Sequence, residues 1–220
     1  MTAPRALVVD FYGVLTDGLD DAMSQWCAAD GIDYLRFREV MGEWLGPEGY
    51  ANAAMNPVYA LERGEMQVPD FERRLAERVR PAVLPGRPEA LATDGLLSRM
   101  FDRFRHAPDM AALVRRAKDA GLATALLSNS WGDQYLRDGW DDMFDVVVIS
   151  GEVGMRKPEA RIFEHTSRLL GCDGSQVVFV DDHIVNVQAA AQQGWVSIHH
   201  TSYEQTAAEL ETLFGIPLVH

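Results

Sequence analysis

Five short apolar runs, separated by stretches with a helical pattern, constrain the fold of this chain more than any other feature. Runs of this length, rich in Val, Ile, Leu and Ala, are typical of parallel strands that are buried on both faces. The runs are Ala6–Val9, Leu122–Leu127, Val146–Ile149, Val177–Val180 and Val196–Ile198. Strands that alternate with helices predict βαβ units, and therefore an α/β fold with a doubly wound parallel sheet.

Residues 18–94 interrupt this alternation, because they contain no convincing strand pattern. Helical patterns occur instead at residues 20–29, 34–45, 58–63 and 69–79. We therefore predict two domains. Residues 1–17 and 95–220 form the α/β core, and residues 18–94 form a helical cap that is inserted after the first strand and covers the functional site.

The composition narrows the classes of partner. A net charge of -13 argues against nucleic acid, because a phosphate backbone is bound by basic surfaces. Cys27 and Cys172 are the two cysteines, and they form neither a disulfide framework nor a metal-binding spacing. No run approaches the ~20 apolar residues of a membrane span, and the apolar run before Asp10 is too short for a signal peptide. We predict a cytoplasmic monomer or homodimer with a small-molecule partner and no membrane or nucleic acid partner.

Polar residues stand where several of the apolar runs end. Asp10 follows the first run, Ser128 and Asn129 follow the second, and the pair Asp181-Asp182 follows the fourth. Ligands of open parallel sheets bind beyond the carboxyl ends of the strands, so we expect these side chains to lie close together. Each residue alone has a simpler interpretation as a turn residue or a helix cap, but three strand ends with complementary chemistry favour a site.

These residue types suit phosphoryl transfer. A carboxylate can attack as a nucleophile, and a transferring phosphoryl group needs donors that neutralise its charge. The Ser128 hydroxyl, the Lys157 ammonium and the backbone N–H groups of residues 11–13 and of Asn129 can supply them. The alternative for Lys157 is a solvated residue before a helix that starts at Pro158. Converging carboxylates repel one another, and Mg²⁺ relieves this repulsion.

Four segments carry a resemblance to a known family. Residues 10–16 (DFYGVLT), 127–129 (LSN), 157–158 (KP) and 181–187 (DDHIVNV) resemble the four motifs of the haloacid dehalogenase superfamily of hydrolases. The chain is similar over essentially its whole length to the capped branch, close to the phosphatase-type N-terminal domain of bifunctional epoxide hydrolases. The resemblance implies a Rossmann-like core and a hydrolase.

The resemblance also implies roles for individual residues. Asp10 would be the nucleophile, with Ser128 and Lys157 holding the phosphoryl group. Mg²⁺ would be bound by Asp10, Asp182 and the backbone carbonyl of Tyr12, with Asp181 in support. The candidate substrate-binding residues are Phe11, Gly13, Asn129 and, in the cap, Arg63, with Arg36 and Arg38 as weaker candidates.

Tyr12 departs from the family's phosphatase pattern. Phosphatases of the family usually have a second aspartate there, which protonates the leaving oxygen and then activates water. Tyrosine is poorly suited to this near neutral pH, because its unperturbed pKa is ~10. Dehalogenases of the family carry tyrosine at this place, but they bind no metal. Their fourth motif is similar to serine-serine-asparagine, where this chain has Asp181, Asp182 and His183. They also tend to have a tyrosine where this chain has Phe163.

These motifs favour a Mg²⁺-dependent phosphate-monoester hydrolase that acts on a small phosphorylated metabolite. The predicted partner is thus a small phosphorylated or otherwise anionic metabolite. Two alternatives stay open: a non-catalytic binder of phosphorylated ligands, and a 2-haloacid dehalogenase or another hydrolase of carbon–halogen bonds. If alkyl phosphates are hydrolysed quickly, His183 or a cap side chain is the first candidate for the missing proton donor.

Overall fold

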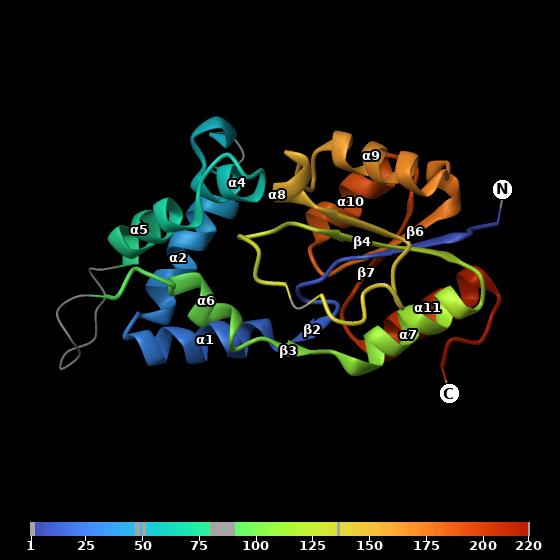
Figure 1. The fold of residues 1–220 in the computed structure, drawn as a ribbon, viewed down its shortest axis with the longest axis horizontal. Coiled ribbons are helices and arrows are strands. Elements are labelled where there is room, and N and C mark those ends of the chain that lie inside the picture. Colours follow the sequence, from blue (N-terminus) through green and yellow to red (C-terminus); the bar gives the residue numbers. More distant parts are fainter. Residues whose placement is uncertain (1–2, 47–48, 50–51, 80–90, 136, 220) are drawn as a thin grey trace. The chain divides into compact units, whose positions relative to one another are not determined.

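The chain divides into two compact units in a computed structural model (Figure 1), which describes residues 3–46, 49, 52–79, 91–135 and 137–219. The α/β unit consists of Met1–Asp17, His106–Asn129 and Tyr135–His220. The helical unit consists of Gly18–Arg105 and Ser130–Gln134. A two-stranded sheet of β2 (Thr16–Asp17) and β3 (Arg105–His106) forms where the chain leaves one unit and returns to it.

The α/β unit is built on a five-stranded parallel sheet with the strand order β5-β4-β1-β6-β7. The strands are β1 (Ala6–Val9), β4 (Ala123–Ser128), β5 (Val146–Ile149), β6 (Val177–Asp181) and β7 (Val196–His199). Val9 pairs with Leu126 on one side and with Val180 on the other, so the carboxyl ends of three strands are level with one another. The predicted doubly wound parallel sheet is confirmed.

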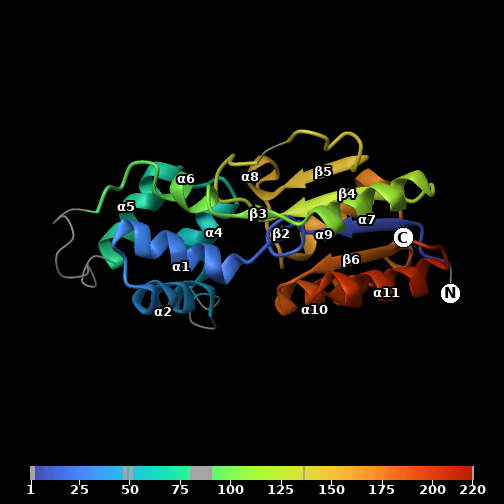
Figure 2. The same cartoon turned by 90° about the horizontal axis from the view of Figure 1, so that it is seen from below.

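Both faces of this sheet are buried, as expected for strands that are apolar throughout. Leu7 and Val9 belong to one core cluster, whereas Ala6 and Val8 belong to the other. Figures 1 and 2 show the helices in two layers, with α9 and α10 on one side of the sheet and α7 and α11 on the other. The helices of this unit are α7 (Pro108–Asp119), α8 (Ser150–Val153), α9 (Ala160–Leu170), η3 (Gly174–Gln176), α10 (Ile184–Gln192) and α11 (Tyr203–Phe214).

The helical unit has a core of its own, centred on buried Trp26, Phe37, Tyr59 and Phe71. Its helices are α1 (Leu19–Asp30), α2 (Tyr34–Leu45), η1 (Ala53–Met55), α4 (Pro57–Glu62), α5 (Val68–Val79) and α6 (Leu96–Phe101). The segment that follows β4 also belongs to this unit: Trp131 Nε1 donates to Glu62 Oε1 at 3.1 Å, and its ring centroid lies 5.5 Å from that of Phe71.

The division of the structure differs from the predicted boundaries at two places. The prediction ended the helical insertion at residue 94, whereas the helical unit continues to Arg105 and also takes in Ser130–Gln134. Helix α6 is held in this unit by Glu72, whose side chain accepts from the backbone of Gly95 and Leu97. Residues 80–90 of the predicted cap lie outside the described residues, and the position of the cap over the site stays a prediction.

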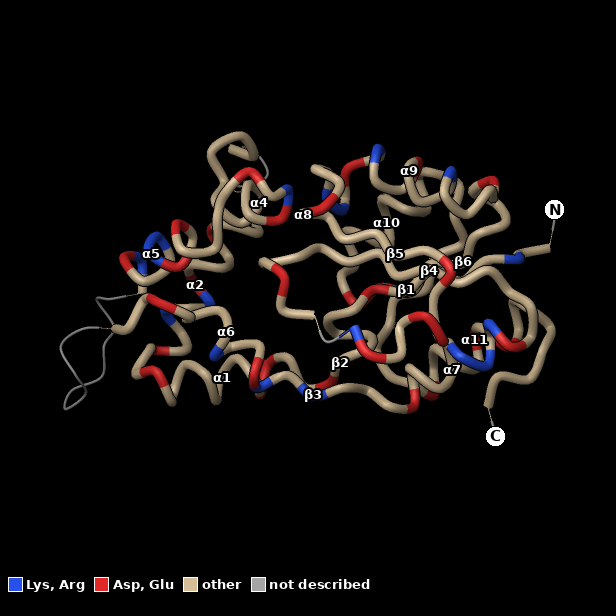
Figure 3. The backbone as a smooth tube through the Cα atoms, in the orientation of Figure 1, with Lys and Arg blue, Asp and Glu red and all other residues tan. Residues whose placement is uncertain are grey.

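Acidic side chains occur along both units rather than in one segment (Figure 3), so the charge of -13 is spread over the chain. Within the described residues, no helix combines the length and the apolar character that crossing a membrane requires.

Glu72 provides a test of how the helical unit is held together. Its side chain is 3% exposed and accepts from Leu97 N at 2.8 Å and from Gly95 N at 3.2 Å. Glu72→Ala leaves two backbone donors at the start of α6 without this acceptor, so we expect the free energy of unfolding in urea to fall by about 2 kcal/mol. Glu77→Ala, at an exposed position of the same helix, should change it by less than about 0.5 kcal/mol. Equal effects of the two substitutions would contradict this role.

Candidate active site

The strand ends bring together the residues of the four motifs in the α/β unit. Asp10 follows β1, Ser128 ends β4 and Asp181 ends β6, while Lys157 lies in the loop between α8 and α9. Three of these residues are fully buried, namely Ser128, Lys157 and Asp181, and Asp10 is 8% exposed. Buried polar side chains are costly unless they are paired, so their partners define the site.

Lys157 is the cation at the centre of this group. Its Nζ lies 2.9 Å from Asp10 Oδ2 and donates to Asp181 Oδ2 at 2.6 Å. Burial on its own lowers the pKa of the ammonium, but the charges of Asp10 and Asp181 outweigh that effect and raise it. The alternative that Lys157 is a solvated residue before a helix is therefore wrong.

Asp181 is held from several sides. Besides the lysine, its Oδ1 accepts from the backbone N–H of His183 at 2.8 Å, and Asn186 Nδ2 lies 3.1 Å from each of its oxygens. These bonds orient the carboxylate just before α10. The N-cap residue of α10 is His183, and among the described residues no side chain caps this helix end, so the simpler interpretation of Asp181 as a helix cap is wrong. Asn186 was part of the fourth motif, but its bond to Asp181 was not predicted.

Three carboxylates make a group that could hold a metal ion. Asp10, Asp181 and Asp182 each offer an oxygen, and these oxygens lie within 4.8 Å of one another. Burial raises the pKa of Asp10 well above its usual range, opposed by Lys157 and reinforced by Asp181 and Asp182. Burial and then the charge of Asp181 raise the pKa of Asp182. A single lysine does not balance three carboxylates, and this all-oxygen donor set fits a hard divalent cation such as Mg²⁺.

Gly13 lets the loop after β1 approach Asp182 closely. Its φ of 81° favours glycine, and a Cβ at this position would lie 2.3 Å from Asp182 Oδ2. The Gly13 N–H donates to Thr16 Oγ1 at 3.0 Å. Gly13 was predicted to bind substrate through its backbone, and that role stays a prediction; the structure adds a steric reason for glycine here.

Asn129 fastens the second motif to the third. Its side-chain Nδ2 donates to the Lys157 carbonyl at 3.0 Å, and its Oδ1 accepts from the Lys157 N–H at 2.8 Å. This paired contact fixes the backbone from which the lysine side chain reaches Asp10. The predicted contact of Asn129 with substrate concerned its backbone N–H and stays a prediction.

The aromatic residues of the first motif pack together. The Phe11 ring lies 5.0 Å from the Tyr12 ring at 87° and 5.1 Å from the Tyr135 ring at 77°, measured between centroids. The backbone N–H of Phe11 donates to Asp10 Oδ1 at 2.7 Å. The Phe11 side chain, 5% exposed, is thus part of the core, so its predicted contact with substrate would have to come from its backbone.

Tyr135 was not predicted as a site residue. Its hydroxyl lies 2.9 Å from Ser128 Oγ, and its ring lies 5.6 Å from that of Tyr12. Nothing in the sequence separates Tyr135 from the other aromatic residues of the segment after β4, because the contact depends on how that segment folds back.

The predicted cap residue Arg63 lies in the helical unit at the end of α4, where its Nε is 2.8 Å from Glu65 Oε1. Its contact with a substrate stays a prediction.

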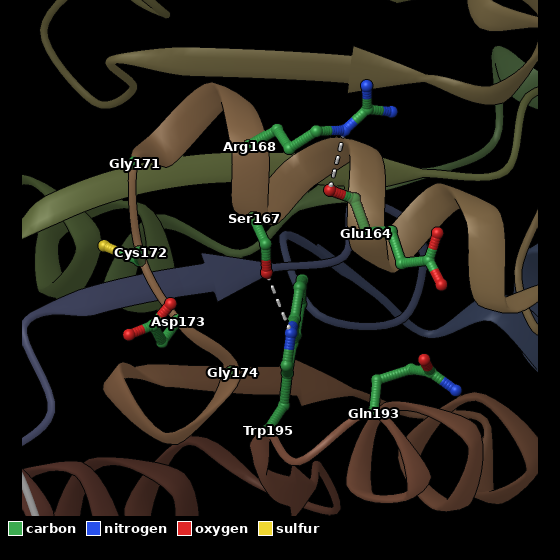
Figure 4. A pocket seen from close by; sticks show the side chains of 9 residues that line it. All are labelled: Glu164, Ser167, Arg168, Gly171, Cys172, Asp173, Gly174, Gln193 and Trp195. Atoms are coloured by element: carbon green, nitrogen blue, oxygen red, sulfur yellow. Dashed lines mark hydrogen bonds between the residues drawn. The ribbon is translucent and has the colours of Figure 1, made fainter.

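Neither of two pockets in the α/β unit is lined by Asp10, Lys157 or Asp181. The one in Figure 4 has a volume of about 500 Å³, and in it Trp195 Nε1 donates to Ser167 Oγ at 3.1 Å. Its residues come from α9 and from the segments before β6 and β7, so it lies at the amino ends of these strands, at the edge of the sheet opposite Asp10. A second pocket, of about 340 Å³, is lined by Phe11, Trp140 and residues of α7 and adjoins the aromatic neighbours of Asp10.

The two lysines of the chain provide a matched test of the charge network. Lys157→Met leaves the buried carboxylates without their cation, so we expect the free energy of unfolding of the metal-free protein to fall by about 3–5 kcal/mol. Lys118 pairs with Asp145 at 3.2 Å in a more exposed place, so Lys118→Met should cost about 1 kcal/mol or less. Urea unfolding in the presence of a chelator measures both values, and similar losses would show that the Lys157 network is not strongly coupled.

Comparisons with known proteins show the family of this chain. The model of the haloacid dehalogenase-like hydrolases matches residues 4–194. The sesquiterpene phosphatase astK of Aspergillus oryzae is 32% identical over 160 residues, which are 70% of this chain and 78% of that protein. Bifunctional epoxide hydrolase 2 of Mus musculus is 30% identical over 139 residues, which are 58% of this chain but 24% of that protein.

A solved structure shares the fold. The haloacid dehalogenase family enzyme bt-2542 of Bacteroides thetaiotaomicron, in complex with magnesium and inorganic phosphate, is 17% identical and has a TM-score of 0.61, covering 90% of this chain and 95% of that one. At this identity the likeness concerns the fold alone. The match of the family model over most of the chain decides the matter: this protein belongs to the haloacid dehalogenase-like hydrolases, as its motifs indicated.

Proposed function

We propose that this hydrolase is a Mg²⁺-dependent phosphatase that cleaves phosphate monoesters with Asp10 as the nucleophile. The observation that carries the proposal is the position of Lys157, whose ammonium joins Asp10 to Asp181 at distances of 2.9 and 2.6 Å. This ammonium group places a full positive charge beside the attacking carboxylate. The phosphoryl oxygens, which carry negative charge during the transfer, would lie at the same place.

The reaction would have two steps, and the first step would use residues of three motifs. An oxygen of Asp10 attacks phosphorus, the ester P–O bond breaks, and the alkoxide or aryl oxide leaves and takes a proton from solvent. Lys157 and the Ser128 hydroxyl hold the phosphoryl oxygens. Water then attacks the aspartyl-phosphate, which releases inorganic phosphate and restores the carboxylate.

Asp10 and Asp182 would hold Mg²⁺ together with the backbone carbonyl of Tyr12, and Asp181 would support them from its bonds to Lys157 and Asn186. When bound, the ion neutralises the carboxylates and the phosphoryl oxygens and holds them in register. The magnesium and phosphate complex of bt-2542 and the phosphatase name of astK support this assignment.

Tyr12 would restrict which phosphate esters are cleaved quickly. Its ring packs edge-on against Phe11 and lies 5.6 Å from Tyr135, and its phenol is a poor proton donor for an alkoxide near neutral pH. Phosphate esters of small molecules with good leaving groups should therefore react faster than alkyl esters. The tyrosine also suits a dehalogenase, because a halide leaves without a proton; a metal-independent release of halide from 2-haloacids would favour that function.

Gly13 tests the metal site without removing a ligand. A Cβ at Gly13 would force Asp182 to turn away, whereas a Cβ at Gly121, which has a φ of 87°, meets nothing within 4 Å. Both Gly13→Ala and Gly121→Ala introduce a similar backbone strain of about 1–2 kcal/mol. Calorimetric titration should show Mg²⁺ affinity about ten-fold or more weaker in Gly13→Ala, weaker still in Asp182→Ala, and unchanged in Gly121→Ala. Equal Mg²⁺ affinity in Asp182→Ala and wild type would remove the metal assignment.

Tyr12 tests the role of proton transfer. Tyr12→Asp supplies a group that can donate and accept a proton, so we expect steady-state turnover of alkyl phosphates with Mg²⁺ to rise about ten-fold or more. Aryl phosphates should gain less at the first step, because an aryl oxide leaves without protonation.

Two further variants complete that experiment. Tyr12→Phe keeps the ring and should behave like wild type, and Asp10→Asn should abolish turnover of both esters. If wild type already hydrolyses alkyl phosphates quickly and Tyr12→Asp is no faster, another residue donates the proton. If neither wild type nor Tyr12→Asp hydrolyses any phosphate ester, the phosphatase proposal is wrong.

A further inference from the structure

The hydroxyl of Ser128, which the proposed mechanism uses, has a partner outside the four motifs. Tyr135 OH lies 2.9 Å from Ser128 Oγ, an ordinary distance for a hydrogen bond between hydroxyls. The two residues are 0% and 8% exposed, so the bond is shielded from water. The nearby Asn129 carbonyl lies 3.5 Å from Ser128 Oγ, where a hydrogen bond is weak.

The Tyr135 ring is fixed by aromatic neighbours from two directions. Its centroid lies 5.1 Å from that of Phe11 and 5.6 Å from that of Trp140, both with near-perpendicular planes. Tyr12 lies on it at 5.6 Å with an angle of 32° between the planes. Side chains packed in this way have little rotamer freedom, so the phenolic oxygen is held at one place relative to β4.

The direction of the hydrogen bond follows from the acidity of the two groups. The geometry allows either hydroxyl to be the donor. Because a phenol is a stronger donor than an alkyl hydroxyl, the favoured arrangement has Tyr135 donating and Ser128 Oγ accepting. Ser128 then keeps its own proton for another acceptor, and the accepted bond polarises its O–H. Without Tyr135, the serine hydroxyl could turn toward other acceptors, such as the Asn129 carbonyl.

We propose that Tyr135 is a positioning residue of the phosphatase site: it orients the Ser128 hydroxyl so that the serine proton points to a phosphoryl oxygen. This inference rests on the proposed function. The inference also implies a second role for Tyr12, because its ring packs against the ring of Tyr135.

Tyr135→Phe removes the hydroxyl and keeps the ring, so it isolates the bond. We expect kcat/KM for an aryl phosphate to fall about three- to ten-fold, and the affinity for inorganic phosphate with Mg²⁺ to fall by a similar factor in calorimetry. The matched control is Tyr203→Phe, which also removes a hydroxyl of the α/β unit, one that accepts from Arg116 at 3.3 Å. It should change neither quantity by more than about two-fold.

A double-mutant cycle separates positioning from a general loss of structure. If Tyr135 acts through Ser128, the double variant Ser128→Ala/Tyr135→Phe should be no less active than Ser128→Ala alone. Multiplying effects would instead show that Tyr135 acts independently of the serine, and the inference would be wrong. It would also be wrong if Tyr135→Phe and Tyr203→Phe behaved alike.

Two measurements, the turnover of an aryl phosphate and the affinity for inorganic phosphate, distinguish this inference from the proposed function. If wild type binds phosphate but turns over no ester, the phosphatase proposal fails, and the phosphate affinities of Tyr135→Phe, Ser128→Ala and the double variant still decide the role of Tyr135. If wild type neither binds phosphate nor turns over esters, both are overturned.

Discussion

One buried ammonium group organises the carboxyl edge of the sheet. Lys157, with 0% exposure, bonds to Asp10 and Asp181, and without it three carboxylates would converge without a cation. Its backbone is tied to Asn129 at the end of β4, so the interaction links the ends of three neighbouring strands. Each buried ion loses several kcal/mol of hydration free energy, which offsets the attraction between the charges. The network therefore need not stabilise the folded protein. Its placement at the strand ends, where a parallel sheet binds its ligands, is what connects it to the proposed chemistry.

The sequence predicted the parts of this fold that follow from local pattern. Apolar runs marked the parallel strands, and the rule that ligands bind at their carboxyl ends predicted that Asp10, Ser128 and Asp181 lie close together. Contacts made by irregular segments were not predictable. The segment after β4 has no periodic pattern, so neither the bond of Trp131 to Glu62 nor that of Tyr135 to Ser128 could be inferred from it. The helical unit extends beyond the predicted end at residue 94 for a related reason: α6 is short, and a buried Glu72 from α5 holds it in the helical unit.

The aromatic neighbours of Asp10 give the site its individual character. Where phosphatases resembling this chain carry a second aspartate, Tyr12 packs with Phe11 and Tyr135. The Tyr12 ring also lies 5.6 Å from the ring of Tyr135, the residue that we propose orients the Ser128 hydroxyl. The chain would thus combine a strong electrostatic site for the phosphoryl group with weak proton transfer to the leaving group. Such a site should favour transfer to Asp10 over release from it, because the attack of water on the acyl-phosphate lacks a base.

The central claim is that Asp10 becomes phosphorylated during turnover. Mixing the wild-type protein with an aryl phosphate and Mg²⁺, quenching it in acid within the first turnovers, and mapping its peptides by mass spectrometry would test this claim directly. We predict phosphate on the peptide that contains Asp10, at a sizeable fraction of the protein, and none when Mg²⁺ is chelated. Phosphate released at a measurable rate with no modified Asp10, or with the phosphate on another residue, would contradict it.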